Sequence, residues 1–297
     1  MAFLGQRVSA GSVDDCLILF FNMPTRATSS SPVTHVSITR ADRERQALTQ
    51  TKDCVIEETP VALVYNDVSH VVLLATPDNA LHDLALGFGL SEGILLNTDE
   101  LLDCECVVEE KGILMEMRVS NRAFEALKGR RRALAGRTGC GLCGIESLNH
   151  VIQNVPKIHT TMSALSCESI FNAIRENTNH QVLRQQTGAT HSAAWFNAEG
   201  QLLFLREDVG RHNALDKLIG AMATARATHA GGFCFISSRA SFEMVQKAAM
   251  QGIAVLVAAS APTATAIRLA EAAGVCLIGF ARENKLVIYT SKHCIRF

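Results

Sequence analysis

Two cysteines in the middle of the chain have the type and spacing to carry chemistry. Cys140 and Cys143 lie in the stretch Arg-Thr-Gly-Cys-Gly-Leu-Cys-Gly-Ile-Glu-Ser, residues 137–147. Its three glycines predict a loop, and apolar residues at helical spacing over residues 148–155 predict a helix directly after it. The positive end of a helix favours a thiolate over a thiol, and arginines at positions 130, 131, 132 and 137 act in the same direction. This loop is therefore the predicted chemical centre.

Three kinds of site are compatible with such a cysteine pair. A structural zinc site needs four ligands, and the sequence has no second Cys-x-x-Cys and no close histidine pair. A dithiol oxidoreductase carries its motif after a strand near the start of its domain, whereas this pair follows an arginine-rich segment. A nucleophilic or sulfur-handling cysteine is the interpretation that composition and spacing favour, with no permanently bound metal. Spacing does not decide whether Cys140 or Cys143 would carry the sulfur.

Composition limits the class of protein. With 297 residues, 48% of them hydrophobic, the chain can bury a large core and is long enough for two domains. A net charge of −1 argues against non-specific binding to nucleic acid. Most of the ten cysteines stand singly in apolar runs, as Cys54, Cys234 and Cys276 do, which is typical of reduced thiols in the cytoplasm. The apolar run at residues 16–21 is far shorter than the roughly 20 residues that span a bilayer, so no membrane association is expected.

Hydrophobic periodicity divides the chain into three parts. Residues 1–50 are rich in Ser, Thr and Arg without apolar periodicity and predict a poorly ordered extension. Residues 51–135 predict a small α+β domain, with a hairpin turn at Asn66-Asp67, a helix around residues 81–88 and paired strands at 104–109 and 113–119. Residues 136–297 predict an α/β domain with a mainly parallel sheet flanked by helices. Its expected strands are residues 191–196, 202–206, 233–236, 254–258, 275–280 and 286–289.

Polar residues follow several of these strands. Ligands of such sheets bind in the loops at the carboxyl ends of the strands. Ser260 and the arginines Arg239 and Arg282 lie in these loops, where a solvated side chain and a phosphate-binding side chain are both plausible. His191 begins a strand, and by itself it is as compatible with a buried or capping histidine as with a functional one. His212 shares a helical face with the aspartates at positions 208 and 216, so a helix-start ion pair and a functional role are equally compatible with its position.

Several of these motifs together resemble the FdhD family, the formate dehydrogenase accessory sulfurtransferases. The resemblance covers about residues 51–290. It rests on Thr76-Pro77, Asp83-Leu-Ala-Leu-Gly-Phe88, Ser91-Glu-Gly93, Cys140-Gly-Leu-Cys-Gly144, Gly188-Ala-Thr-His191, Glu207-Asp-Val-Gly-Arg-His-Asn-Ala-Leu-Asp-Lys217, Ser237-Ser-Arg239 and Ser260-Ala-Pro-Thr263.

The resemblance implies a sulfur carrier that is required for formate dehydrogenase activity. Such a protein accepts sulfur from a cysteine desulfurase as a persulfide on Cys140 and transfers it to the bis-guanine-dinucleotide form of the molybdenum cofactor, before that cofactor enters the catalytic subunit of formate dehydrogenase. The resemblance also implies a homodimer and a cytidine deaminase-like larger domain. Cofactor-binding residues are expected at His191, His212, Arg239, Ser260 and the family's cofactor segment, which corresponds here to Phe280, Ala281, Arg282, Glu283, Asn284 and Lys285.

Deaminase chemistry itself is not expected. Zinc deaminases need His-x-Glu followed by Pro-Cys-x-x-Cys, whereas this chain has His191-Ser-Ala, and its cysteine pair precedes the histidine. Two alternatives to sulfur transfer remain at this point. One is a chaperone that binds the cofactor without sulfur chemistry, and the other is a deaminase-like enzyme that modifies nucleotides.

Overall fold

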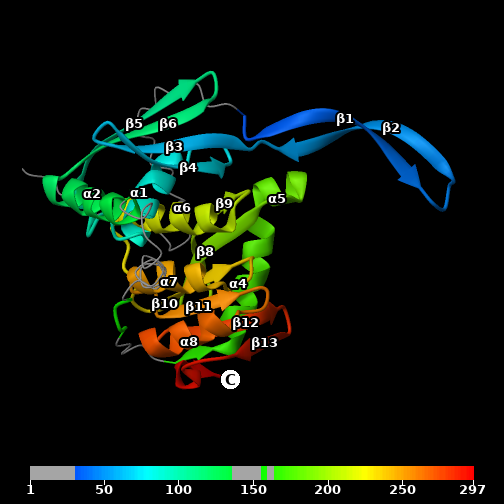
Figure 1. The fold of residues 1–297 in the computed structure, drawn as a ribbon. Helices are drawn as coiled ribbons and strands as arrows, with labels where there is room; N and C mark the ends of the chain where they lie inside the picture. The colour runs from blue at the N-terminus through cyan, green and yellow to red at the C-terminus, as the bar shows by residue number, and fades with distance from the viewer. Residues whose placement is uncertain (1–30, 136–154, 159–163) are drawn as a thin grey trace, which may run out of the picture.

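The computed structural model describes residues 31–135, 155–158 and 164–297 of the chain. The predicted cysteine loop, with Cys140 and Cys143, and the helix expected after it lie outside these residues. Figure 1 shows a small sheet above a larger one, with helices between the two sheets and beside the larger sheet. Among the helices that the structure describes, none combines the length and the apolar character needed to cross a bilayer.

A small sheet is built from the first part of the body. Its strands are β3 (Thr59–Tyr65), β4 (Val68–Ala75), β5 (Leu101–Glu109) and β6 (Gly112–Val119), in the order β4-β3-β6-β5. The predicted turn at Asn66-Asp67 joins β3 to β4, and both turn residues have positive φ, at 43° and 63°. Asn and Asp tolerate this conformation, which two-residue hairpin turns require. Helix α1 (Leu81–Ser91), the short η1 (Thr98–Glu100) and α2 (Asn121–Ala135) complete this part.

The expected poorly ordered extension is in part a β-hairpin. Strands β1 (Val33–Asp42) and β2 (Ala47–Ile56) pair in antiparallel fashion over ten residue pairs. In Figure 1 this hairpin projects as an arm away from the rest of the chain. Most of its side chains are exposed, because neither face of the two-stranded arm lies on a core formed by the described residues. The prediction of disorder was therefore wrong for residues 33–50.

A six-stranded sheet forms the second part, in the order β13-β12-β11-β10-β8-β9. Its strands are β8 (His191–Asn197), β9 (Leu202–Asp208), β10 (Gly232–Ile236), β11 (Val255–Ala258), β12 (Cys276–Arg282) and β13 (Lys285–Ile288). All six expected strands are confirmed. The expectation of a mainly parallel sheet was wrong, because only the pairs β10–β11 and β11–β12 are parallel. The other three pairs are antiparallel, since β8–β9 and β12–β13 are joined by hairpins and β8 opposes β10.

Helices cover both faces of this sheet. One face packs with α6 (Arg211–Thr224), α7 (Phe242–Met250) and α8 (Ala264–Ala273) in a core that extends to the small sheet. The other face packs against α4 (Cys167–His180) in a second core. The remaining elements are α5 (Val182–Thr187), β7 (Leu165–Ser166), η2 (Lys292–Cys294) and β14 (Ile295–Arg296), of which β7 and β14 pair.

Helices α1 and α6 cross at very short range and join the two parts. A Cβ atom at Gly87 would overlap the backbone of Asp216, and one at Gly220 would overlap the backbone of Asp83. Both glycines are buried. The close approach of the two helices therefore requires residues without side chains at these two positions.

Candidate functional site

Four strands of the larger sheet end at the same edge. Because β8 is antiparallel to both β9 and β10, the strands β9, β10, β11 and β12 run in one direction and their carboxyl ends meet. The first residue of β8, His191, lies at this edge, where it pairs with Asp208 at the end of β9. The predicted gathering of the loops is thus confirmed, although the sheet is mixed.

Backbone hydrogen bonds continue the sheet into these loops. The N–H of Ser237 donates to the carbonyl oxygen of Ser192 at 3.0 Å, and the N–H of Ser260 donates to that of Ser238 at 3.3 Å. The N–H of Phe280 in turn donates to the carbonyl oxygen of Ser260 at 3.1 Å. The loops after β10 and β11 and the end of β12 therefore lie side by side, and we call this region the sheet-edge site.

His191 lies in a cationic part of the sheet-edge site. Its Nδ1 atom is 3.4 Å from the hydroxyl oxygen of Ser237, which also accepts a hydrogen bond from the backbone N–H of Ser192 at 2.9 Å. Burial lowers the pKa of His191, and the positive charges of Arg211 and Arg184 lower it further. The positive potential that disfavours the imidazolium would favour a bound anion.

Arg211 and Arg184 were not singled out as site residues from the sequence. Arg211 begins α6, and its buried Nε atom has no hydrogen-bond partner among the residues that the structure describes. Arg184 lies on α5 and donates through Nη1 to the carbonyl oxygen of Thr190 at 2.8 Å. Arg211 lies in the motif from Glu207 to Lys217, so the sequence did contain a signal for it. The position of Arg184 near His191 depends on how α5 packs, for which the sequence has no local signal.

His212 does not form the expected ion pair. Its Nε2 atom is 3.8 Å from a carboxylate oxygen of Glu243 on α7. This buried atom has no hydrogen-bond partner in the described part of the chain. Burial lowers the pKa of His212, as does the neighbouring Arg211. The predicted partners Asp208 and Asp216 are instead held by buried lysines, so the interpretation as a helix-start ion pair was wrong.

The predicted cofactor segment forms the end of β12 and the turn into β13. Phe280 is 44% exposed and has a φ of 49°, a conformation that residues other than glycine rarely adopt. Ala281 is buried in the second core. Arg282 donates to the carbonyl oxygen of Ala259 in the neighbouring loop. Glu283, Asn284 and Lys285 are exposed, Arg239 is exposed and Ser260 is half-buried.

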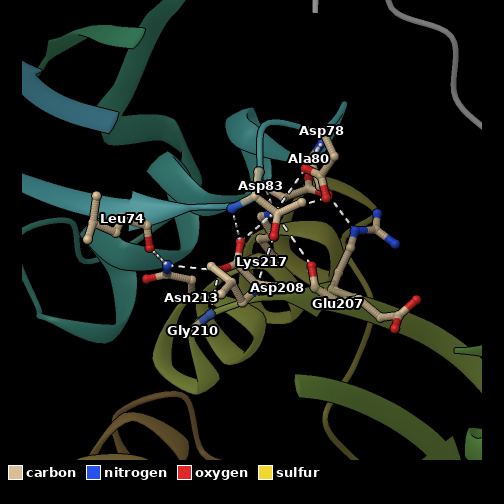
Figure 2. Close-up of polar contacts among 12 residues, drawn as sticks. Leu74, Asp78, Ala80, Asp83, Glu207, Asp208, Gly210, Asn213 and Lys217 are labelled. Atoms are coloured by element: carbon tan, nitrogen blue, oxygen red, sulfur yellow. Dashed lines mark hydrogen bonds and ion pairs between the residues drawn. The ribbon is translucent and has the colours of Figure 1, made fainter. Parts of the chain in front are cut away.

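A buried ion cluster lies beside the sheet-edge site and joins the two sheets (Figure 2). The Lys217 Nζ atom is 2.7 Å from a carboxylate oxygen of Asp208 and 2.9 Å from one of Asp78, and the side chains of Lys217 and Asp208 are both fully buried. Asp208 also accepts hydrogen bonds from the backbone N–H groups of Thr76 and Gly210, at 3.1 and 2.8 Å. We call this arrangement the Lys217 cluster. It fixes the loop after β4 against the loop after β9.

A second buried cluster has the same form. The Lys247 Nζ atom lies 3.0 Å from a carboxylate oxygen of Asp216 and 2.7 Å from one of Glu92. Burial opposes the charge on Lys247, but the carboxylates of Asp216 and Glu92 outweigh it and raise the pKa of the lysine. The hydroxyl of Ser91 donates to Asp216 at 2.6 Å. Motif residues at the end of α1 and on α6 are therefore bound to Lys247 of α7 in the interior.

The cysteines in the described part of the chain are all free thiols. They are Cys54, Cys104, Cys106, Cys167, Cys234, Cys276 and Cys294. Burial raises the pKa of Cys104, Cys234 and Cys276 to about 12 and also raises that of Cys106, Cys167 and Cys294. These six thiols are therefore poor nucleophiles at neutral pH. No group of three or more potential metal ligands occurs among the described residues.

The fold and the cationic sheet edge define a two-sheet α/β protein with a site suited to an anionic ligand. Residues 56–296 match the model of the FdhD/NarQ family, and the chain belongs to that family.

Relatives and a solved structure agree with this assignment. The sulfur carrier protein FdhD of Variovorax paradoxus is 51% identical over 239 residues, which are 80% of this chain and 85% of that protein. The protein of the same name from Cupriavidus necator is 47% identical over 266 residues, or 90% and 92% of the two chains. The crystal structure of a candidate formate dehydrogenase accessory protein from Desulfotalea psychrophila has the same fold. It aligns with a TM-score of 0.67 at 21% identity and covers 89% of this chain and 99% of that one.

Proposed function

We propose that this protein is a sulfur carrier that serves formate dehydrogenase. The observation that carries the proposal is the identity of 47–51% to proteins named sulfur carrier protein FdhD, over 80–90% of this chain. A carrier needs a reactive thiol, and burial has raised the pKa of six cysteines in the described residues. The remaining candidates include Cys140 and Cys143, whose arginine-rich sequence context favours a thiolate.

The proposed transfer begins with a persulfide on a cysteine desulfurase. The Cys140 thiolate attacks the outer sulfur of that persulfide, a new S–S bond forms at Cys140, the donor's S–S bond breaks, and the donor cysteine leaves as a thiolate. The protein then carries a persulfide on Cys140. When its outer sulfur is transferred to the molybdenum cofactor, the S–S bond at Cys140 breaks and Cys140 leaves as a thiolate. The assignment of Cys140 as the carrier, with Cys143 as an assisting thiol, follows the resemblance to the family.

The cofactor is proposed to bind as cargo at the sheet-edge site. Its two guanine dinucleotides carry phosphates, which fit a cationic surface. Arg184 and Arg211 place positive charge beside His191, and the buried Nε atom of Arg211 has no partner within the described residues. Arg239 and Lys285 are exposed at the same edge. These positive charges support binding through the phosphates of the cofactor and make no use of its molybdenum centre.

The remaining expectations also stay proposals. We propose a homodimer in the cytoplasm that delivers the cofactor to the catalytic subunit of formate dehydrogenase. We also propose that the larger sheet and its helices are cytidine deaminase-like. Deaminase chemistry is not part of the proposal, because His191-Ser192-Ala193 lacks the glutamate that moves protons in such enzymes.

Intact-mass spectrometry tests the carrier function. The full chain is incubated with a cysteine desulfurase and cysteine, and we expect one added sulfur atom that a reductant removes. Cys140→Ala should abolish this addition, whereas the matched control Cys54→Ala, in the exposed arm, should retain it. Formate dehydrogenase activation should fail with Cys140→Ala. Loading or activation that persists in this variant would refute the assignment of Cys140, and activation without both Cys140 and Cys143 would favour a cofactor-binding chaperone.

A further inference from the structure

Glu207 is a buried carboxylate beside the sheet-edge site that the proposed function does not use. It precedes Asp208 on β9, and neighbouring residues of a strand point to opposite faces. Asp208 turns toward the Lys217 cluster, whereas Figure 2 shows the side chain of Glu207 pointing away from that cluster. Because only 7% of Glu207 is exposed, its carboxylate needs hydrogen-bond donors on the other side.

These donors come from α5 and from the residue before His191. One carboxylate oxygen of Glu207 accepts a hydrogen bond from the backbone N–H of Leu183 at 2.8 Å. The other accepts from the backbone N–H of Arg184 and from the hydroxyl of Thr190, each at 2.8 Å. The residue before α5 provides no side-chain cap for the helix. Glu207 therefore satisfies two of the N–H groups that the start of a helix leaves without a partner.

The side chain of Arg184 closes the same network. Its Nη1 atom donates to the carbonyl oxygen of Thr190 at 2.8 Å, and Thr190 is buried. Glu207 thus holds both the backbone of Arg184 and the residue that the guanidinium contacts. Arg184 is otherwise exposed, so its guanidinium still has N–H groups to offer an anion.

His191 senses the position of the Arg184 charge. Burial lowers the pKa of His191 most, and the charges of Arg211 and Arg184 lower it further. The carboxylate that acts on His191 in the opposite direction is that of Asp208. An effect of Glu207 on His191 is therefore expected to pass through Arg184.

We propose that Glu207 is a positioning residue of the sheet-edge site, which holds α5 so that the guanidinium of Arg184 lies beside His191 and binds a phosphate of the cofactor's guanine dinucleotides. The identity of this ligand rests on the proposed function. Glu207 does not contact the phosphate, because two negative groups repel each other. Its charge alone weakens anion binding and its hold on Arg184 strengthens it, so the two effects differ in sign.

Calorimetric binding of guanosine diphosphate to the full chain tests this sign. Glu207→Ala should weaken binding by about tenfold, the loss expected for one charge-assisted hydrogen bond. It should weaken binding little further in an Arg184→Ala background, because the same contact is already absent. The matched control Glu199→Ala removes a carboxylate from the turn at the other end of the β8–β9 hairpin and should leave the affinity unchanged.

The outcomes separate this inference from the proposed function. Unchanged or tighter binding by Glu207→Ala, or full additivity with Arg184→Ala, would overturn the positioning role. Absence of guanosine diphosphate binding to the natural protein would refute the proposed cofactor site. A measurement without ligand then decides the role of Glu207.

NMR titration of His191 in the ligand-free chain is that measurement, with the resonance identified by its loss in His191→Gln. Glu207→Ala should raise the pKa of His191 about as far as Arg184→Ala does, and the double variant should raise it no further. An equal rise in the Arg184→Ala background would show that Glu207 only keeps the region closed, and would overturn the inference.

Glu207→Gln provides a second variant that keeps the volume of the side chain if Glu207→Ala does not fold. Either orientation of the amide turns its NH2 group toward a backbone N–H of α5, so one hydrogen bond is lost and another is kept. We expect a smaller rise in the pKa of His191 and a smaller loss of affinity than in Glu207→Ala. An unchanged pKa together with tighter binding would contradict the positioning role.

Discussion

Replacing Lys217 by methionine should destabilise the protein strongly. Lys217 and Asp208 are fully buried with 2.7 Å between their charged groups, so the substitution leaves a buried carboxylate without its cation. Removing one partner of a buried ion pair costs about 3–5 kcal/mol. We expect about 3 kcal/mol here, since Asp208 retains the backbone N–H groups of Thr76 and Gly210. That loss is a large fraction of the roughly 5–15 kcal/mol that stabilises a typical protein.

Urea denaturation followed by far-UV circular dichroism measures this loss. Lys128→Met is the matched control, because Lys128 pairs with Glu125 on an exposed helix surface and should change the free energy of unfolding by less than about 1 kcal/mol. The double variant Lys217→Met, Asp208→Asn should be less destabilised than the sum of its single variants, because it no longer buries an unpaired charge. A change of under about 1 kcal/mol for Lys217→Met alone would refute the reasoning.

Two further predictions concern packing and pH. Gly87→Ala should destabilise the protein by about 1–3 kcal/mol, because the added methyl group meets the backbone of α6. The control is Gly129→Ala on α2, where a Cβ atom meets open space, and this substitution should be neutral or stabilising in the same denaturation assay. The carboxylate of Glu100 accepts a hydrogen bond from the guanidinium of Arg122, which lowers the pKa of Glu100 from 4.5 to about 2. The stability that this carboxylate contributes is therefore present above pH 4.5 and lost as the pH falls toward 2. Melting temperatures of the natural protein and of Glu100→Gln should converge over that interval, and a constant difference would contradict the pKa assignment.

The sequence predicted individual elements well where their apolar residues pack in a core. The hairpin at Asn66-Asp67 and the helix at α1 combine a periodic apolar pattern with a local turn or start signal, and both are confirmed. The arm was not predicted because, among the strands that the structure describes, β1 and β2 pair only with each other. Because neither face of these strands packs on a core of the described residues, their sequences have no alternation of apolar and polar residues that would predict a strand.

Strand direction and long-range partners were harder to predict. The interior residues of β8 are buried on both faces, as in a parallel strand, yet β8 is antiparallel to both neighbours. Helical spacing placed His212 beside Asp208 and Asp216, but Lys217 and Lys247 take those carboxylates. Local spacing identifies which side chains could meet and does not decide which of several partners is closest.

The Lys217 cluster affects how family membership should be understood. Much of the motif from Glu207 to Lys217 has a structural role, because it connects the two sheets. Its residues Asp208 and Lys217 form an ion pair in the interior. A chain that kept these residues and had lost its paired thiols would assemble the same framework and match the same family model. Recognition by this motif therefore reports an intact scaffold, and the capacity to move sulfur has to be established at the cysteines themselves.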